Sequence, residues 1–182
     1  MRKIPFSPPD ITEAEISEVI ETLKSGWITT GPKTKALEHA AAEICHTSKA
    51  VCLNSNTACA EMTLRILGVG PGDEVIVPAY TYTATASVIA HVGAKIVMVD
   101  CGPGKFTMDY DQLEASITEK TKVIIPVDLF GIPADYDRIL EIAEKKRDIF
   151  IPSDNKIQQA VGRTIVMDDA AHSFGAVYKE KP

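Results

Sequence analysis

The sequence has no hydrophobic run long enough to cross a membrane. A membrane-spanning helix needs about 20 consecutive apolar residues, and no window of the 182-residue chain approaches that. The opening residues, Met1–Phe6, also lack the hydrophobic core of a secretory signal peptide. We therefore expect a globular protein that has no membrane partner.

Positive charge is not in excess either. The chain has 19 Lys and Arg residues against 25 Asp and Glu residues, which gives a net charge of −6 at pH 7. Surfaces that bind nucleic acid normally show clustered basic residues, and here the lysines are scattered along the chain. We predict that nucleic acid is not a partner.

Cysteine is scarce, and its spacing has no pattern of a metal site. The four cysteines are too widely spaced for a zinc ribbon, and the histidines have no ligand-type spacing. We predict no metal site. Reduced cysteines are typical of the cytoplasm, which is where we place the protein.

The chain also lacks the glycine-rich loops of common nucleotide sites. Neither a Walker sequence nor G-x-G-x-x-G follows the first predicted strand, where Asn54–Thr57 stands instead. This argues against an ATPase and against a standard dinucleotide-binding protein.

What the sequence does contain is a regular alternation of predicted strands and helices. Two amphipathic helices come first, at 12–23 and 33–45, and Thr12 with Glu15 forms a capping-box pattern. Strands are predicted at 50–53, 74–77, 94–99, 122–125 and 164–167, with helices between them at 57–67, 83–91, 109–117 and 135–146.

The strand residues do not alternate polar and apolar side chains, which favours a parallel sheet covered on both faces. We therefore predict one α/β domain. The segment at about 148–162 is longer than a normal helix–strand connection, so we interpret it as a surface excursion that is partly helical.

Two loops that follow predicted strands have side chains suited to binding, and open α/β sheets bind ligands at this edge. Asn54–Ala58 opens a helix, whose free amides and hydroxyls can bind a phosphate; the alternative is an ordinary Ser or Asn cap. Tyr80–Tyr82 can stack a ring on a flat heterocycle; the alternative is a core tyrosine.

The third loop follows the predicted strand 164–167 and contains Asp168, Asp169 and His172. One acid could simply cap the next helix. Alternatively, Asp169 faces a cationic ring nitrogen, an attraction of about 5 kcal/mol at 3 Å and an effective dielectric constant near 20, before desolvation. A phosphate loop, a stacking ring and an acid together are what pyridoxal 5'-phosphate (PLP) requires of a protein.

Five motifs, in the same order, resemble those of the DegT/DnrJ/EryC1/StrS family of sugar aminotransferases. They are Ser25–Pro32, Leu53–Ala58, Val77–Thr85, Ile125–Gly131 and Asp168–Gly175. The resemblance implies the aspartate-aminotransferase (type I) fold, with a mostly parallel sheet sandwiched by helices. It also implies PLP as cofactor, glutamate as amino donor, a nucleotide-linked keto-sugar as substrate, and a homodimer.

The resemblance assigns the Leu53–Ala58 motif to the cofactor phosphate. Thr57 and Ala58 would bind the phosphate, with help from Ser55 or Asn56. Asn56 stands where glycine is common in the family, which is a departure, although Asn tolerates positive φ better than most residues.

The other motifs supply the ring and substrate contacts. By resemblance, Tyr82 would stack on the cofactor ring, Asp169 would pair with the pyridine nitrogen, and His172 would lie beside the ring hydroxyl. Thr30 and Gly31 would line the substrate side.

The family's Schiff-base lysine lies beyond Pro182, and Lys179 and Lys181 come too early to replace it. We therefore expect residues 1–182 to be the N-terminal portion of the PLP-binding large domain, inactive alone, with the small C-terminal domain missing. Two alternatives are open: a non-catalytic half-domain that binds PLP or a nucleotide-sugar, and a PLP-dependent sugar dehydratase relative.

Overall fold

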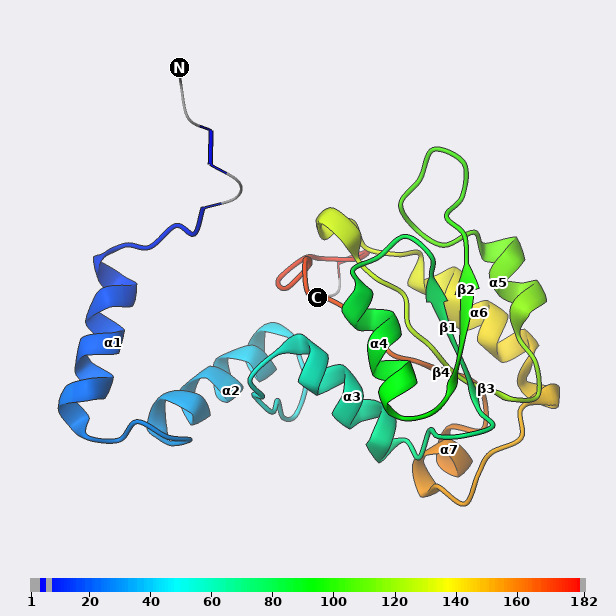
Figure 1. The fold of residues 1–182 in the computed structure, drawn as a ribbon, viewed down its shortest axis with the longest axis horizontal. Helices are drawn as coiled ribbons and strands as arrows, with labels where there is room; N and C mark the ends of the chain where they lie inside the picture. The colour runs from blue at the N-terminus through cyan, green and yellow to red at the C-terminus, as the bar shows by residue number, and fades with distance from the viewer. Residues whose placement is uncertain (1–3, 6–7, 181–182) are drawn as a thin grey trace. The chain divides into compact units, whose positions relative to one another are not determined.

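The computed structural model describes residues 4–5 and 8–180, and the chain divides into two compact units, Met1–Cys52 and Leu53–Pro182. The first unit contains two helices, α1 (Glu13–Ser25) and α2 (Pro32–Ile44) (Figure 1). Both were predicted from the sequence, within two residues at each end.

Helix α1 begins at the predicted capping box. The Thr12 side chain accepts the Ala14 N–H at 3.2 Å, and the Glu15 carboxylate accepts the Thr12 N–H at 2.6 Å. The hydrogen bonds that the Thr12 hydroxyl and the Thr12 N–H donate to the Glu15 carboxylate lower the pKa of the Glu15 carboxyl. The helix ends where Gly26 adopts φ +71°, a left-handed conformation that costs glycine little. No residue of α1 is buried.

The loop between α1 and α2 is closed by its own tryptophan. Trp27 donates its indole N–H to the Thr30 carbonyl at 3.0 Å, and the indole lies against Gly31. A Cβ atom at Gly31 would come within 2.0 Å of the indole nitrogen, so the indole can take this position only beside glycine.

The second unit is built on four parallel strands, in the order β2-β1-β3-β4. The strands are β1 (Glu74–Pro78), β2 (Lys95–Val99), β3 (Thr121–Ile124) and β4 (Ile165–Val166). The helices around them are α3 (Asn56–Ile66), α4 (Thr83–His91), α5 (Tyr110–Ser116), α6 (Tyr136–Lys145) and α7 (Lys156–Val161), with short 3-10 turns at Leu129–Gly131 and Arg147–Ile149. The predicted α/β class and the parallel sheet are confirmed.

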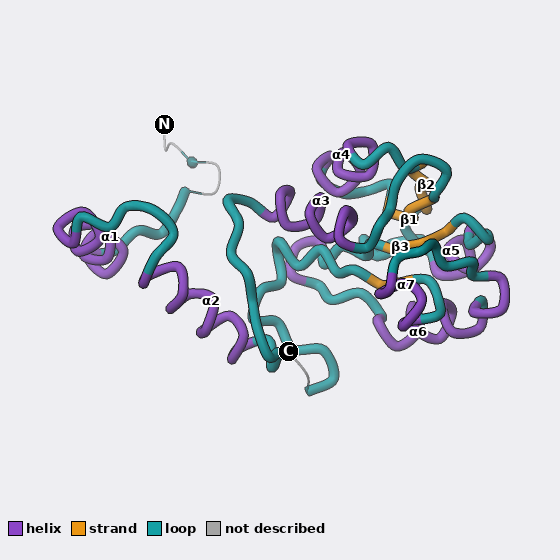
Figure 2. The backbone as a smooth tube through the Cα atoms, turned by 90° about the horizontal axis from the view of Figure 1, so that it is seen from below, coloured by secondary structure: helices purple, strands orange, loops and turns teal. Residues whose placement is uncertain are grey.

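The sheet has an apolar core on each face. On one face Val75, Val77 and Val123 pack with Leu64 of α3 and Val88 of α4. On the other face, Ile76 of β1 and Ile124 of β3 pack with side chains from α5 and α6. These side chains are Leu113 and Ile117, from α5 and the residue that follows it, and Ile139 and Ile142 of α6. Figure 2 shows the two helical layers with the strands between them. Burial of β1 and β3 on both faces explains the successive apolar residues in these two strands, whereas the edge strand β2 is partly exposed.

The predicted strand at 50–53 is wrong. Its residues form no strand ladder within the described chain, and Val51 is 74% exposed. A strand requires backbone partners on a neighbouring strand, and β-branched residues alone do not provide them. The last strand is also shorter than the predicted 164–167.

The predicted excursion begins within the 3-10 helix η2, Arg147–Ile149, and contains the helix α7. Gln158 of α7 is fully buried and donates to the Leu67 carbonyl at 2.7 Å. Asn155, which caps α7, donates to the Ile66 carbonyl at 2.8 Å. The excursion is therefore fastened to the C-terminal end of α3. Across the described ranges, no helix combines the length and the apolar character that crossing a bilayer demands.

Candidate active site

The candidate site lies where β1, β3 and β4 end. Beyond β4 the chain continues beside the residues that follow β3, because the Asp169 N–H donates to the Pro126 carbonyl at 3.0 Å and the Asp128 N–H donates to the Asp169 carbonyl at 3.2 Å. These backbone bonds fix Asp169 at the carboxyl edge of the sheet, the edge at which α/β folds bind ligands.

A cavity of about 190 Å³ opens at this edge. It is lined by five residues that the sequence singled out, Asn56, Thr57, Tyr82, Asp169 and His172. The remaining lining residues are Thr81, Ala84, Thr85, Val127, Leu129 and Ala171. The structure thus brings three loops together, among them those of Asn56 and Asp169, which are 113 residues apart in the chain.

Asp169 is the buried acid of the cavity, with 8% of its surface exposed. One carboxylate oxygen accepts the Asn56 side-chain amide at 2.8 Å and the Ala171 N–H at 3.3 Å, and the other accepts the Thr85 hydroxyl at 2.7 Å. A carboxylate has about four acceptor positions. Three donors therefore leave room for one more, as an incoming ring N–H would need.

The start of α3 forms another wall. Ser55 caps the helix, and its hydroxyl accepts the Ala58 N–H at 3.1 Å. The amides of Asn56 and Thr57, in the first turn, have no intrahelical acceptors. Ser55 and Ala58 do not line the cavity, whereas Asn56 and Thr57 do. Asn56 has no positive φ, and its side chain is used to hold Asp169.

Tyr82 and His172 lie at the cavity with different surroundings. Tyr82 precedes α4 and is 76% exposed, so its ring is free to cover a ligand. The Nδ1 atom of His172 accepts the Phe130 N–H at 3.3 Å. This contact assigns the neutral ring's proton to Nε2.

Thr30 and Gly31 belong to the first unit, and their substrate role stays a prediction. The Thr30 carbonyl is occupied by the Trp27 indole, as described above.

Sequence reasoning missed Thr85 as a site residue. It is 3% exposed and is the hydroxyl donor to Asp169. Its position one helical turn after Tyr82 was a usable signal, because residues three or four apart share a helix face.

A second acid, Asp168, lies beside the site without lining the cavity. The Tyr136 hydroxyl contacts both Asp168, at 2.5 Å, and the buried Asp128, at 2.7 Å. Asp168 is exposed as a residue, but partial burial of its carboxyl raises its pKa to about 6, assisted by the charges of Asp128 and Asp169 and opposed by the Tyr136 hydrogen bond. Burial, together with the same two contacts, raises the pKa of the Tyr136 hydroxyl.

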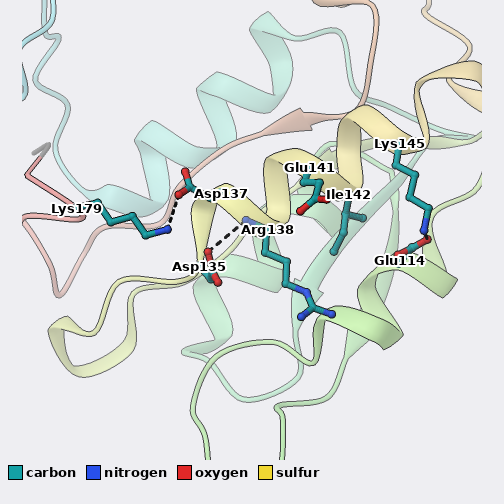
Figure 3. A pocket seen from close by; sticks show the side chains of 8 residues that line it. All are labelled: Glu114, Asp135, Asp137, Arg138, Glu141, Ile142, Lys145 and Lys179. Atoms are coloured by element: carbon teal, nitrogen blue, oxygen red, sulfur yellow. Dashed lines mark hydrogen bonds and ion pairs between the residues drawn. The ribbon is translucent and has the colours of Figure 1, made fainter.

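A larger hollow, of about 480 Å³, runs along α6 and shares no residue with the Asp169 cavity (Figure 3). Its cationic side chains are already paired, Lys145 with Glu114 and Lys179 with Asp137, while Arg138 pairs with Asp111. Lys181 lies outside the described residues. Paired surface charges leave little attraction for a ligand, so we do not consider this hollow the site.

Comparison with known proteins agrees with this geometry. Residues 9–182 match the DegT/DnrJ/EryC1/StrS aminotransferase family. The chain belongs to this family. A curated relative, the UDP-4-amino-4-deoxy-L-arabinose–oxoglutarate aminotransferase of Shewanella sediminis, is 40% identical over 179 residues, which cover 98% of this chain and 42% of the relative.

Solved structures of the same kind superpose well. The PLP-form of "Putative sugar aminotransferase Spr1654" from Streptococcus pneumoniae is 62% identical with a TM-score of 0.97, over 100% of this chain and 46% of that one. DesV of S. venezuelae is 34% identical with a TM-score of 0.79, over 93% and 42%. The type I aminotransferase fold and the family predicted from the sequence are confirmed. The chain spans less than half the length of these relatives.

Proposed function

We propose that the chain forms the cofactor-binding part of a PLP-dependent aminotransferase that acts on nucleotide-linked keto-sugars, with glutamate as the amino donor. The observation that carries the proposal is the buried Asp169 carboxylate, which shares one cavity with the N-terminus of α3. The names of the curated and structural relatives agree with a sugar substrate and with PLP.

The residues of the cavity fit the proposed cofactor. Asn56, Thr85 and the Ala171 N–H orient the Asp169 carboxylate and leave an acceptor position open. A carboxylate in that position holds a proton on a ring nitrogen, because the charged pair attracts more strongly in a buried site than in water. PLP, when bound, supplies an electron-accepting ring for amino transfer.

The other cavity residues have complementary roles in the proposal. The first-turn amides of α3 and the Thr57 hydroxyl bind the phosphate, since a helix N-terminus favours anions. Tyr82 covers the ring and excludes water from it, and His172 presents Nε2–H towards the ring hydroxyl. Thr30 and Gly31 contribute to the substrate side.

We further propose a cytoplasmic homodimer. All four cysteines are unpaired, which fits a reducing compartment. Ile16, Val19, Ile20 and Leu23 form an exposed apolar stripe on α1, and a stripe of this kind is normally covered by another surface.

The test is equilibrium dialysis of the chain against PLP, followed by absorbance. We expect PLP retention by the wild-type chain, and Asp169→Asn should weaken it at least about tenfold, because the charged partner of the ring nitrogen is lost. Asp154→Asn, the same change at an exposed position, is the matched control and should retain PLP. Equal retention by Asp169→Asn and Asp154→Asn would refute the assignment of Asp169.

A further inference from the structure

The loop after β3 is hydrogen-bonded to the segment that carries Asp169 and His172. The Asp128 N–H donates to the Asp169 carbonyl at 3.2 Å, and the Asp128 carboxylate accepts the Ser173 hydroxyl at 2.8 Å. Between these two points the Phe130 N–H donates to His172 Nδ1. Asp128 therefore holds both ends of the segment, and its own loop holds the histidine in the middle.

Asp128 is suited to this task because it is buried and its carboxylate accepts three hydrogen bonds. It is 4% exposed, and its carboxylate accepts the Ala134 N–H at 2.8 Å and the Tyr136 hydroxyl at 2.7 Å as well as the Ser173 hydroxyl. Hydrogen bonds to a charged group are stronger than those between neutral groups, so Asp128 locks its own loop and the site segment together.

The Tyr136 hydroxyl poses a proton-counting problem. It has one hydrogen, yet two carboxyl groups, those of Asp128 and Asp168, lie within hydrogen-bond distance of its oxygen. Both contacts are satisfied only if one carboxyl carries a proton of its own. Asp128 has two other donors to stabilise its negative charge, so the extra proton belongs on Asp168, which then donates to the Tyr136 oxygen.

We propose that Asp128 is a positioning residue for the proposed cofactor site, and that Asp168 keeps it in place by holding a proton at the Tyr136 hydroxyl. This rests on the proposed function only for what Asp169 and His172 bind. The relay Asp168–Tyr136–Asp128–Ser173 ends on the segment that carries both residues.

The charged surroundings of the relay are few. Besides Asp128, the carboxylate of Asp169 acts on Asp168 from its own segment. On the side of α6, Tyr178 packs edge-on against Tyr136 and donates its hydroxyl to Asp135, and Lys179 pairs with Asp137. Because burial raises the pKa of Asp168 to about 6, the proton is held there below about pH 6 and is released above it.

Carboxyl NMR titration of the chain tests the proton count without any cofactor. The wild-type protein should show an Asp168 midpoint near 6, absent in Asp168→Asn. Asp128→Asn should lower that midpoint by about one pH unit, because it removes a negative neighbour and leaves the Tyr136 hydrogen to Asp168 alone. Tyr136→Phe should also lower the midpoint, because it removes the oxygen that accepts the Asp168 proton.

Ser173→Ala separates the relay from simple loosening, because it loosens the segment but leaves both carboxyl groups and the Tyr136 hydroxyl in place, so the Asp168 midpoint should stay near 6 in that variant. A wild-type midpoint at the ordinary value near 4, or a midpoint lowered as much by Ser173→Ala as by Asp128→Asn and Tyr136→Phe, would overturn the proposal.

Amide hydrogen exchange tests the positioning itself. Asp128→Asn, and the milder Ser173→Ala, should speed exchange at Asp169–Ser173 about tenfold, with no change in Asp154→Asn. Asp128→Asn should also weaken PLP retention at least about fivefold, a loss of about 1 kcal/mol. Unchanged exchange in both variants would refute the role of Asp128. If the wild-type chain retains no PLP, the proposed function fails, while the titration and exchange still decide the role of Asp128.

Discussion

Replacement of Thr85 by valine tests the support of the central acid. Valine has the same shape as threonine, so the change removes only the hydroxyl that donates to Asp169 at 2.7 Å. Thr85 is 3% exposed and Asp169 is 8% exposed, so water cannot easily replace the lost donor. A hydrogen bond to a charged group contributes about 1.5–3 kcal/mol, and a buried acceptor left unpaired costs a similar amount.

We therefore expect Thr85→Val to lower the unfolding free energy by about 2 kcal/mol, roughly a 30-fold change in the unfolding equilibrium constant. Urea denaturation followed by far-UV circular dichroism measures it. Tryptophan fluorescence is unsuitable, because the only tryptophan, Trp27, lies in the first unit and not with Thr85.

The matched control is Thr83→Val, on the same helix at an exposed position. It removes the same hydroxyl from a side chain that has water available, so its effect should stay within about 0.5 kcal/mol. If the two variants unfold at the same urea concentration, the Thr85 hydroxyl does not stabilise the Asp169 carboxylate, and the account of the site given above is wrong.

Three further changes test other parts of the second unit. Gln158→Ala removes the buried donor to the Leu67 carbonyl and should lower the unfolding free energy, measured by thermal denaturation, by about 2 kcal/mol. The exposed control Gln159→Ala should lower it by less than about 0.5 kcal/mol, and equal losses in the two variants would contradict this. Gly131→Ala should destabilise more than Gly104→Ala in the same assay: both glycines have positive φ, but only at Gly131 would the new Cβ approach a backbone oxygen, that of His172, at 3.2 Å. Because its pKa is raised to about 6, folded Asp168 holds a proton that the unfolded chain releases near pH 4, so its contribution favours folding at low pH and is lost as the pH rises through 6. The stability of the wild type relative to Asp168→Asn should fall between about pH 4 and pH 6, and a difference that is flat in pH would count against the proton.

The sequence predicted those features whose causes are local. Thr12 and Glu15 are three residues apart, so the start of α1 could be recognised without any knowledge of the rest of the fold. The order of strands and helices followed from apolar periodicity, because a strand buried on both faces must be apolar throughout. The segment 50–53 failed for the converse reason: its β-branched and apolar residues satisfy the pattern, but no strand ladder forms there.

The site was predictable as a group of loops and not as a set of contacts. Motif order and the sheet-edge rule placed Thr57, Tyr82 and Asp169 near one another. The pairing of Asn56 with Asp169, across 113 residues, depends on how the helices pack and has no local signal. Asn56 looked like a departure from glycine when it was judged by backbone freedom alone; the structure shows that its side chain is used.

The two ends of helix α3 contact different parts of the second unit. Its first turn lines the Asp169 cavity, while the side-chain amides of Asn155 and Gln158 donate hydrogen bonds to the carbonyls at its C-terminal end. Eleven residues span about 16 Å, and a helix of that length behaves as a stiff rod. A deletion or insertion in the segment 148–162 would therefore shift α3 along its axis. Such a change, remote from the cavity, can alter the affinity for an anion there without replacing any residue that contacts the anion.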